Sequence, residues 1–200
     1  MAKSIVFCAD GTWNGPGQDE NKDSLPNGTN VLKTFCNLKG EVSIETAKLL
    51  NEQEKVCLDD KGMPVQIAKY IHGVGDSRNS LIHLLGGVFG AGVVQRIVRG
   101  YTFISRHYES GDRIYLIGFS RGAYTVRALS GLILSIGLLN KNTLDLSNKE
   151  AAYQYGVAAW VEYRRKMMGA KSSLFSYLTE FVARNIPAGG LNTEAAKCGK

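Results

Sequence analysis

The chain has 200 residues, which is enough for one domain with a hydrophobic core and marginal for two. Hydrophobic residues make up 44% and charged residues 21%, as in ordinary globular proteins, so the composition argues against a disordered chain. The formal net charge is +6, but lysine and arginine are scattered rather than blocked, and we expect no nucleic-acid partner.

The N-terminal segment and the cysteines indicate a chain made in a reducing compartment. The segment turns polar at Asp10, too soon for a signal peptide, and no apolar run approaches the roughly 20 residues of a transmembrane helix. The four cysteines form no Cys-x-x-Cys motif, and no histidine stands at metal-ligand spacing from them. We therefore expect synthesis in the cytoplasm and neither a metal nor a cofactor.

The first half of the chain contains two strand-like segments and a short helix. Residues 4–9 form an apolar run that ends at a polar turn, as a buried strand does. Thr29 is placed to cap a helix over residues 30–37. Residues 64–72 have the pattern of a second strand. We interpret the mixed, charged stretch 40–63 as an insertion, with a helix over residues 44–54.

The second half alternates helices with one strand. An amphipathic helix is predicted over residues 93–108, with its apolar side chains at helical spacing and Arg96, Arg99 and Arg106 pointing elsewhere. A near-continuous apolar run over 113–118 predicts a strand covered on both faces. The remaining predicted segments are a helix over 121–136 closed by Gly137, a helix opened by a capping box at 147–150 and running to 168, a last helix over 174–184, and a loosely ordered tail over 187–200.

These elements together predict a single α/β domain over residues 1–200. Strands that alternate with helices favour a mostly parallel sheet with helices on both faces. No internal repeat and no low-complexity tract interrupts this pattern.

The segment Gly118-Phe119-Ser120-Arg121-Gly122 matches the nucleophile elbow G-x-S-x-G. The motif is short enough to arise by chance, but here a predicted strand precedes it and a helix follows, as it requires. Its two glycines allow close approach around a strained turn, which projects the serine hydroxyl from the strand's carboxyl end. The segment predicts an α/β-hydrolase-like domain with Ser120 as nucleophile. The alternative is a strand–turn–helix whose glycines serve packing alone.

Two backbone segments are candidates for an oxyanion hole. The N–H of Arg121 lies at the positive N-terminus of the helix after the elbow. A second donor normally comes from the loop after an earlier strand, where the N–H of Gly11 or Thr12 is the candidate and Asp10 holds the loop. A simple Asp-Gly turn would account for the same residues.

The general base and acid of a serine hydrolase are not found after Ser120. On this fold the chain order is Ser, acid, His. However, His72, His83 and His107 all precede Ser120, and Asp145 is the only aspartate that follows it. A local role in a polar turn is favoured for Asp145, and a strand-end role for His72. We therefore expect an incomplete, N-terminal part of the fold, with acid and base beyond residue 200, in a fragment, a truncated gene product or a degenerate copy.

Four segments in chain order resemble one family. They are residues 8–14 (CADGTWN), 29–31 (TNV), 73–75 (GVG) and 118–127 (GFSRGAYTVR), of which the last is the most specific. The chain is similar to the α/β-hydrolase-like family that includes the Tle-type phospholipase effectors of type VI secretion. The resemblance implies a serine lipase or phospholipase with Ser120 as nucleophile. Asp10, Gly11 and Thr12 match the family's first-strand motif, whereas its later acid and histidine have no counterpart.

Two functions remain as hypotheses. The first is a lipase or phospholipase that acts on a lipid or another ester by acyl transfer. The second is a catalytically inactive homologue that binds a partner or an anionic membrane surface, as the missing base and the positive charge suggest. If the chain is an effector, we expect an immunity or secretion partner and export by a non-classical route.

Overall fold

The structure is a computed structural model that describes residues 2–11, 29–43, 52–73, 91–168 and 191–192. The chain divides into two compact units. The first consists of Met1–Ile97 and Gly111–Arg127, and the second of Val98–Ser110 and Ala128–Lys200. Each unit is described by itself below.

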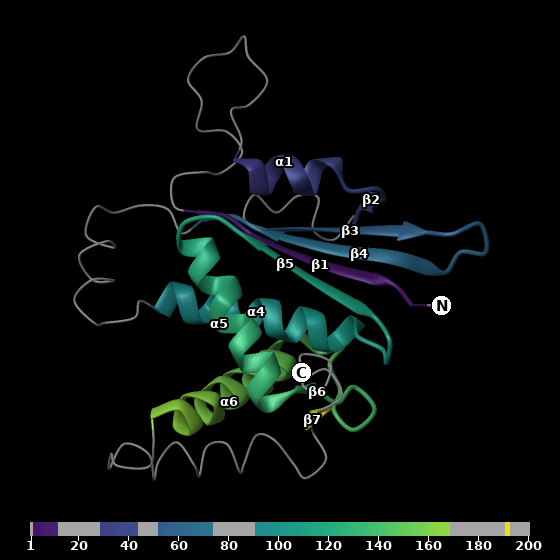
Figure 1. Cartoon of the computed structure of the whole chain (residues 1–200). Helices are drawn as coiled ribbons and strands as arrows, with labels where there is room; N and C mark the ends of the chain where they lie inside the picture. The colour runs from purple at the N-terminus through teal and green to yellow at the C-terminus, as the bar shows by residue number, and fades with distance from the viewer. Residues whose placement is uncertain (1, 12–28, 44–51, 74–90, 169–190, 193–200) are drawn as a thin grey trace. The chain divides into compact units, whose positions relative to one another are not determined.

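The first unit is built on a five-stranded sheet (Figure 1). In spatial order its strands are β2 (Glu41–Val42), β3 (Glu52–Leu58), β4 (Pro64–Ile71), β1 (Ser4–Ala9) and β5 (Arg113–Gly118). β1 is parallel to both β4 and β5, whereas β3 is antiparallel to β4 and β2 is antiparallel to β3. The sheet is therefore mixed, and the expected parallel arrangement is limited to β4, β1 and β5.

The parallel register brings the carboxyl ends of three strands to one level. Ala9 of β1 lies opposite Ile71 of β4 and opposite Gly118 of β5. The segments that follow these three residues therefore start side by side at the carboxyl end of the parallel strands. Ligands bind at this end in open α/β sheets.

β1 is the most deeply buried strand of this sheet, and Ile5, Phe7 and Cys8 are fully buried within it. Its apolar run thus has the predicted structure. For β5, the expectation of a strand covered on both faces is wrong, because Tyr115 is 45% exposed. Among the described residues β5 pairs with β1 alone, so it stands at the edge of the sheet.

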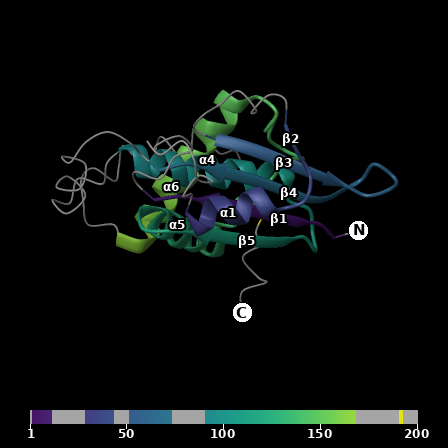
Figure 2. The ribbon, with the colours of Figure 1, turned by 90° about the horizontal axis from the view of Figure 1, so that it is seen from above.

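The helix α1 (Asn30–Asn37) lies on one face of the sheet, and the first turns of α4 and α5 lie on the other (Figures 1 and 2). Val31 and Phe35 of α1 pack against Cys8 and Tyr70 of the sheet. The predicted cap is confirmed, since the hydroxyl of Thr29 accepts a hydrogen bond from the Leu32 N–H at 3.1 Å. Helices on both faces were predicted and are present.

The longer helices begin and end close to their predicted bounds. They are α4 (Ala91–His107), α5 (Arg121–Ile136) and α6 (Lys149–Met168). Gly137, with φ of +89°, ends α5, as predicted, and its N–H donates to the carbonyl of Ile133.

The capping box predicted for α6 is wrong by one residue. The Asn148 side chain, rather than that of Ser147, accepts hydrogen bonds from the N–H groups of Glu150 and Ala151, both at 3.1 Å. The Ser147 hydroxyl donates instead to Asp145 at 2.5 Å. An asparagine caps a helix as well as a serine does, so the motif did not decide between the two neighbours.

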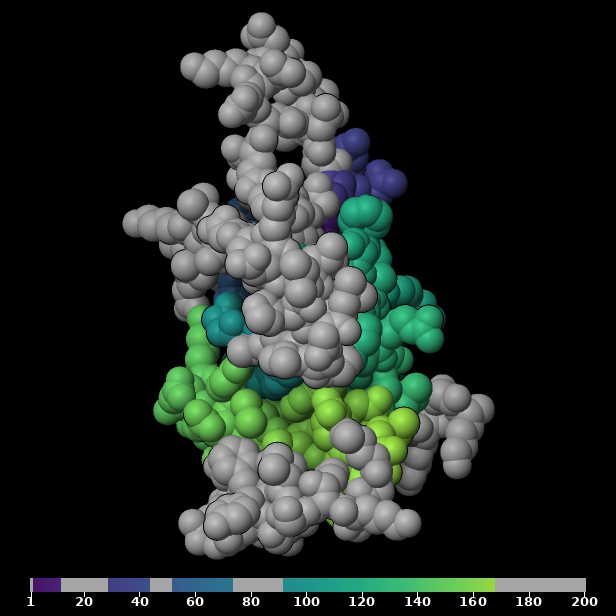
Figure 3. All heavy atoms as spheres, turned by 90° about the vertical axis from the view of Figure 1, so that its left-hand side faces the viewer, coloured from purple at the N-terminus to yellow at the C-terminus, as the bar shows by residue number. Residues whose placement is uncertain are grey.

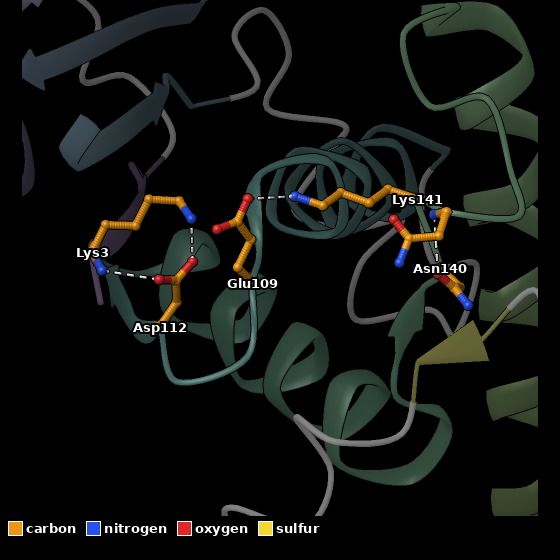
Figure 4. Close-up of polar contacts among 6 residues, drawn as sticks. Lys3, Glu109, Asp112, Asn140 and Lys141 are labelled. Carbon is orange, nitrogen blue, oxygen red and sulfur yellow. Dashed lines mark hydrogen bonds and ion pairs between the residues drawn. The ribbon is translucent and has the colours of Figure 1, made fainter. Parts of the chain in front are cut away.

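The second unit holds the rest of α4 and α5, α6, and the short strands β6 (Leu138–Leu139) and β7 (Leu191–Asn192), which pair antiparallel. Tyr101 of α4 donates its hydroxyl hydrogen to the carbonyl of Gly137 at 3.0 Å. On the surface of this unit Lys141 pairs with Glu109 at 3.1 Å (Figure 4).

The helix predicted over residues 44–54 is wrong where it can be checked. Glu52 and Glu54 lie in β3, and both pair with Lys69 of β4, at 3.3 and 2.7 Å. Residues two apart on a strand point to the same face, which brings both carboxylates to one lysine. Residues 44–51, the helix predicted over 174–184 and most of the tail lie outside the described residues.

No helix among the described residues is both long enough and apolar enough to cross a membrane.

Candidate active site

Ser120 occupies the sharp junction between β5 and α5. Its φ is +52°, and it is the only non-glycine residue of the described chain with a positive φ. This left-handed conformation is disfavoured for residues with a Cβ atom, and such strain gathers at functional sites. The side chain is exposed. Ser120 therefore stands exposed in a strained turn between a strand and a helix.

The turn at Ser120 requires glycine at positions 118 and 122, because the backbones of β5, α5 and β1 are in contact there. A Cβ atom on Gly118 would lie 2.5 Å from the carbonyl oxygen of Gly122. A Cβ atom on Gly122 would overlap the carbonyl oxygen of Ala9 at the end of β1. The start of α5 is thus packed directly onto the ends of β5 and β1, which fixes where Ser120 stands.

The first turn of α5 places backbone N–H groups close to Ser120. The N–H of Ala123 donates to the Ser120 carbonyl at 2.9 Å, and that of Gly122 donates to Phe119 at 2.8 Å. Arg121 is the first residue of the helix, and the first turn contains no acidic residue. A helix N-terminus carries partial positive charge and attracts an anion. Negative charge that develops beside Ser120 would therefore be stabilised here.

Two aromatic side chains close to Ser120 in the sequence are exposed. Phe119 and Tyr124 are 53% and 43% exposed, although both are large side chains. The face of the molecule in Figure 3 shows atoms of α5 and of α1 at the surface. Exposed aromatic side chains beside a candidate nucleophile suit an apolar substrate.

Gly11, a predicted oxyanion donor, lies against the turn that carries Ser120. A Cβ atom on Gly11 would stand 3.0 Å from the Cβ atom of Ser120 and 3.3 Å from the carbonyl oxygen of Phe119. However, the Gly11 N–H donates to the Asp10 carboxylate at 2.7 Å. Thr12, the other predicted donor of this loop, lies outside the described residues.

The carboxylate of Asp10 is fully buried and accepts hydrogen bonds from three donors among the described residues. The donors are the Gly11 N–H at 2.7 Å, the Thr29 hydroxyl at 2.6 Å and the Tyr70 hydroxyl at 2.8 Å. Burial and the hydrogen bond to Asp10 raise the pKa of Tyr70 far above its usual range, so that Tyr70 stays a donor. Asp10 thereby joins the end of β1 to β4 and to the cap of α1.

His72 follows β4, two strands away from β5 in the sheet order. Strands lie about 4.8 Å apart, so the His72 backbone is on the order of 10 Å from the strand that carries Ser120. Burial, followed by the positive charge of Arg96, lowers the pKa of His72 below its ordinary value of 6.5. The imidazole is therefore neutral at physiological pH.

Arg96 of α4 is a site residue that sequence reasoning missed. Its side chain is 4% exposed, and Nη2 donates to the carbonyl oxygens of Asp10, Ile71 and His72 at 2.8, 3.1 and 2.5 Å. Burial lowers the pKa of Arg96 to about 10. A signal was present, since Arg96 is three residues after the buried Val93 and thus falls on the apolar face of α4.

The other predicted candidates have local partners. Asp145 is exposed and accepts hydrogen bonds from the Ser147 N–H and hydroxyl, which lower the pKa of its carboxyl. His107 stacks edge-on against Phe103, with ring centroids 5.0 Å apart. His83 lies outside the described residues. No cluster of three His, Cys, Asp or Glu side chains that could hold a metal occurs in the described part of the chain.

Comparison with known proteins places this chain in a family. Residues 3–180 match the family model described as T6SS, phospholipase effector Tle1-like, catalytic domain. An uncharacterized protein of Saccharomyces cerevisiae is 33% identical over 149 residues, which are 72% of this chain and 19% of that protein. The chain thus spans about a fifth of the length of this curated relative. No solved structure matches the chain significantly.

Proposed function

Because the chain belongs to the family of Tle1-like phospholipase effector catalytic domains, we propose that it is a serine hydrolase of carboxylic esters, of the lipase or phospholipase type, with Ser120 as nucleophile. The observation that carries this proposal is the positive φ of Ser120 at the junction of β5 and α5. A strained serine between a parallel strand and a helix N-terminus is the arrangement in which α/β-hydrolases present the nucleophile for acyl transfer.

The proposal includes an α/β-hydrolase-like core. Three features support it: the parallel order β4-β1-β5, the elbow at the carboxyl end of β5, and the loop after β1 that reaches the elbow. In this fold the second oxyanion donor comes from the loop after a neighbouring strand.

In the proposed reaction the Ser120 hydroxyl loses its proton to a general base and its oxygen attacks the ester carbonyl. The tetrahedral intermediate carries its negative charge towards the N–H of Arg121 and the loop of residues 10–12. The second donor of this proposal is the N–H of Gly11 or of Thr12, and in the described structure the Gly11 N–H is bonded to Asp10. Release of the alcohol leaves an acyl-serine, and water then hydrolyses it.

We place the general base and its acid outside these 200 residues. All histidines precede Ser120 in the chain, which is the wrong order for this fold. Asp145 is bonded within its own turn, and His72 follows a strand that is not adjacent to β5. The lipid substrate, and an immunity protein as partner of an effector, belong to the same proposal.

Hydrolysis of phospholipid vesicles tests the proposed reaction. The protein, expressed from its complete gene, is expected to release fatty acid, and Ser120→Ala to abolish the release. Ser135→Ala, an exposed serine of the same helix, serves as the matched control and is expected to keep full activity. Equal activity of Ser120→Ala and Ser135→Ala would contradict the proposal.

A further inference from the structure

We propose that Arg96 is a positioning residue for this site. It holds the loop after β1 against the turn that carries Ser120. The inference deepens the proposed function and rests on it for its catalytic consequence. Arg96 itself touches neither Ser120 nor a substrate; it acts through the backbone of residues 10 and 11.

The contacts of Arg96 join the carboxyl ends of two neighbouring strands. Its Nη2 donates to the carbonyl of Asp10, just beyond β1, and to those of Ile71 and His72 at the end of β4. The Asp10 N–H in turn donates to the Ile71 carbonyl at 2.9 Å. One guanidinium nitrogen therefore fixes the point at which the chain leaves the sheet towards the elbow.

Asp10, whose carbonyl oxygen accepts from Arg96, directly precedes Gly11, which lies against Ser120. A Cβ atom on Gly11 would lie 3.0 Å from the Ser120 Cβ, so a shift of the neighbouring Asp10 would move Gly11 relative to Ser120. The Asp10 carboxylate holds the same turn from its other side through Gly11, Thr29 and Tyr70. Arg96 thus fixes the loop through the Asp10 carbonyl, and the Asp10 carboxylate fixes it through its own hydrogen bonds.

Stability alone does not explain an arginine at this position. Arg96 is buried, yet its Nε and Nη1 have no hydrogen-bond partner in the described structure. A buried donor without a partner costs free energy, and well-packed apolar residues often replace buried charges without loss of stability. A buried and incompletely satisfied polar group in a native structure needs a reason other than stability.

Two measurements on Arg96→Met test the proposal, with Arg99→Met as matched control because Arg99 is exposed and less than one turn further along α4. The first is hydrogen exchange of the Asp10 and Gly11 amides, with the Ile117 amide of β5 as internal reference. The second is the rate of fluorophosphonate labelling of Ser120 in the protein expressed from its complete gene, normalised to the folded fraction.

We expect faster exchange at Asp10 and Gly11 in Arg96→Met, unchanged exchange at Ile117, and labelling slowed by roughly 10²-fold, as for a misplacement of about 1 Å. Arg99→Met should match the wild type in both. If Arg96→Met does not fold, Arg96→Lys replaces it and should be intermediate, because an ammonium keeps the charge without the planar fork.

Each outcome decides the question. Exchange and normalised labelling equal to those of Arg99→Met would overturn the positioning role, as would a labelling rate of Arg96→Lys equal to the wild type. If the wild type is never labelled at Ser120, the proposed function fails. Exchange at Gly11 then still decides whether Arg96 holds the loop.

Discussion

Ser120 stands in a conformation that a residue with a Cβ atom adopts only at a cost. Its φ of +52° follows from the turn between β5 and α5, where the flanking glycines bring three backbones together. In a left-handed conformation a residue other than glycine is less stable by about 1–2 kcal/mol. The strain is thus stored at the one residue whose hydroxyl the proposed reaction uses.

This strain predicts an order of stabilities at position 120. We expect Ser120→Gly to be more stable than Ser120→Ala by up to about 1 kcal/mol, because glycine adopts a positive φ freely while its gain is partly offset by the larger entropy of the unfolded chain. Urea unfolding of the two variants measures the difference. A Ser120→Ala variant as stable as Ser120→Gly would show that the turn is not strained.

His72 gives a prediction for the pH dependence of stability. Its pKa is lowered in the folded state, so on acidification below about 6.5 the unfolded chain takes up the proton first. Stability should therefore fall as the pH drops through this window and be regained as the pH rises. Melting temperatures from pH 7.5 to 5 should fall less steeply for His72→Gln than for the wild type. Parallel curves would contradict the burial of His72 beside Arg96.

At the level of elements, the packing of α5 on the sheet depends on glycine. We expect Gly122→Ala to lower the free energy of unfolding by about 2–3 kcal/mol, because its Cβ atom would overlap the Ala9 carbonyl and only the backbone can move. Gly131→Ala in the same helix is the control. Its Cβ atom meets the Tyr163 hydroxyl, the movable end of a side chain, and alanine favours the helix. Similar losses in both variants would contradict the contact at Ala9.

The opposite end of the sheet is fixed by a buried ion pair between Lys3, before β1, and Asp112, before β5 (Figure 4). Asp112 also accepts a hydrogen bond from the Lys3 N–H at 2.9 Å. We expect Asp112→Asn to cost up to about 3–5 kcal/mol, since it removes the carboxylate from a buried ion pair. Glu109→Gln, in the exposed pair with Lys141, should cost less than about 1 kcal/mol. Thermal unfolding of both variants compares them, and equal losses would contradict the burial of Asp112.

The sequence predicted the elements that have strong local signals. The strand over residues 4–9, the helix capped by Thr29 and the strand–elbow–helix around Ser120 follow from apolar runs, caps and glycines. β3 was missed, because its charged residues are held by Lys69 of the neighbouring strand and such pairing is invisible in a local window. Arg96 was missed for a similar reason, since its partners are carbonyl groups of distant strands.

For the whole molecule, the net charge of +6 bears on whether the chain binds an anionic membrane surface. This question is separate from the proposed ester hydrolysis at Ser120. Scattered basic residues attract an anionic surface only weakly and in a salt-dependent way. If Ser120→Ala binds vesicles that contain anionic phospholipid, binding should weaken as salt rises. This second function, binding without catalysis, would remain if the nucleophile proves inert.

The most direct test is to incubate the protein, expressed from its complete gene, with a fluorophosphonate and to map the modified residue by mass spectrometry. We predict a single covalent adduct, on the peptide that contains Ser120, absent from Ser120→Ala and retained in Ser135→Ala. The absence of an adduct on Ser120, under conditions that fully modify a known serine esterase, would contradict it.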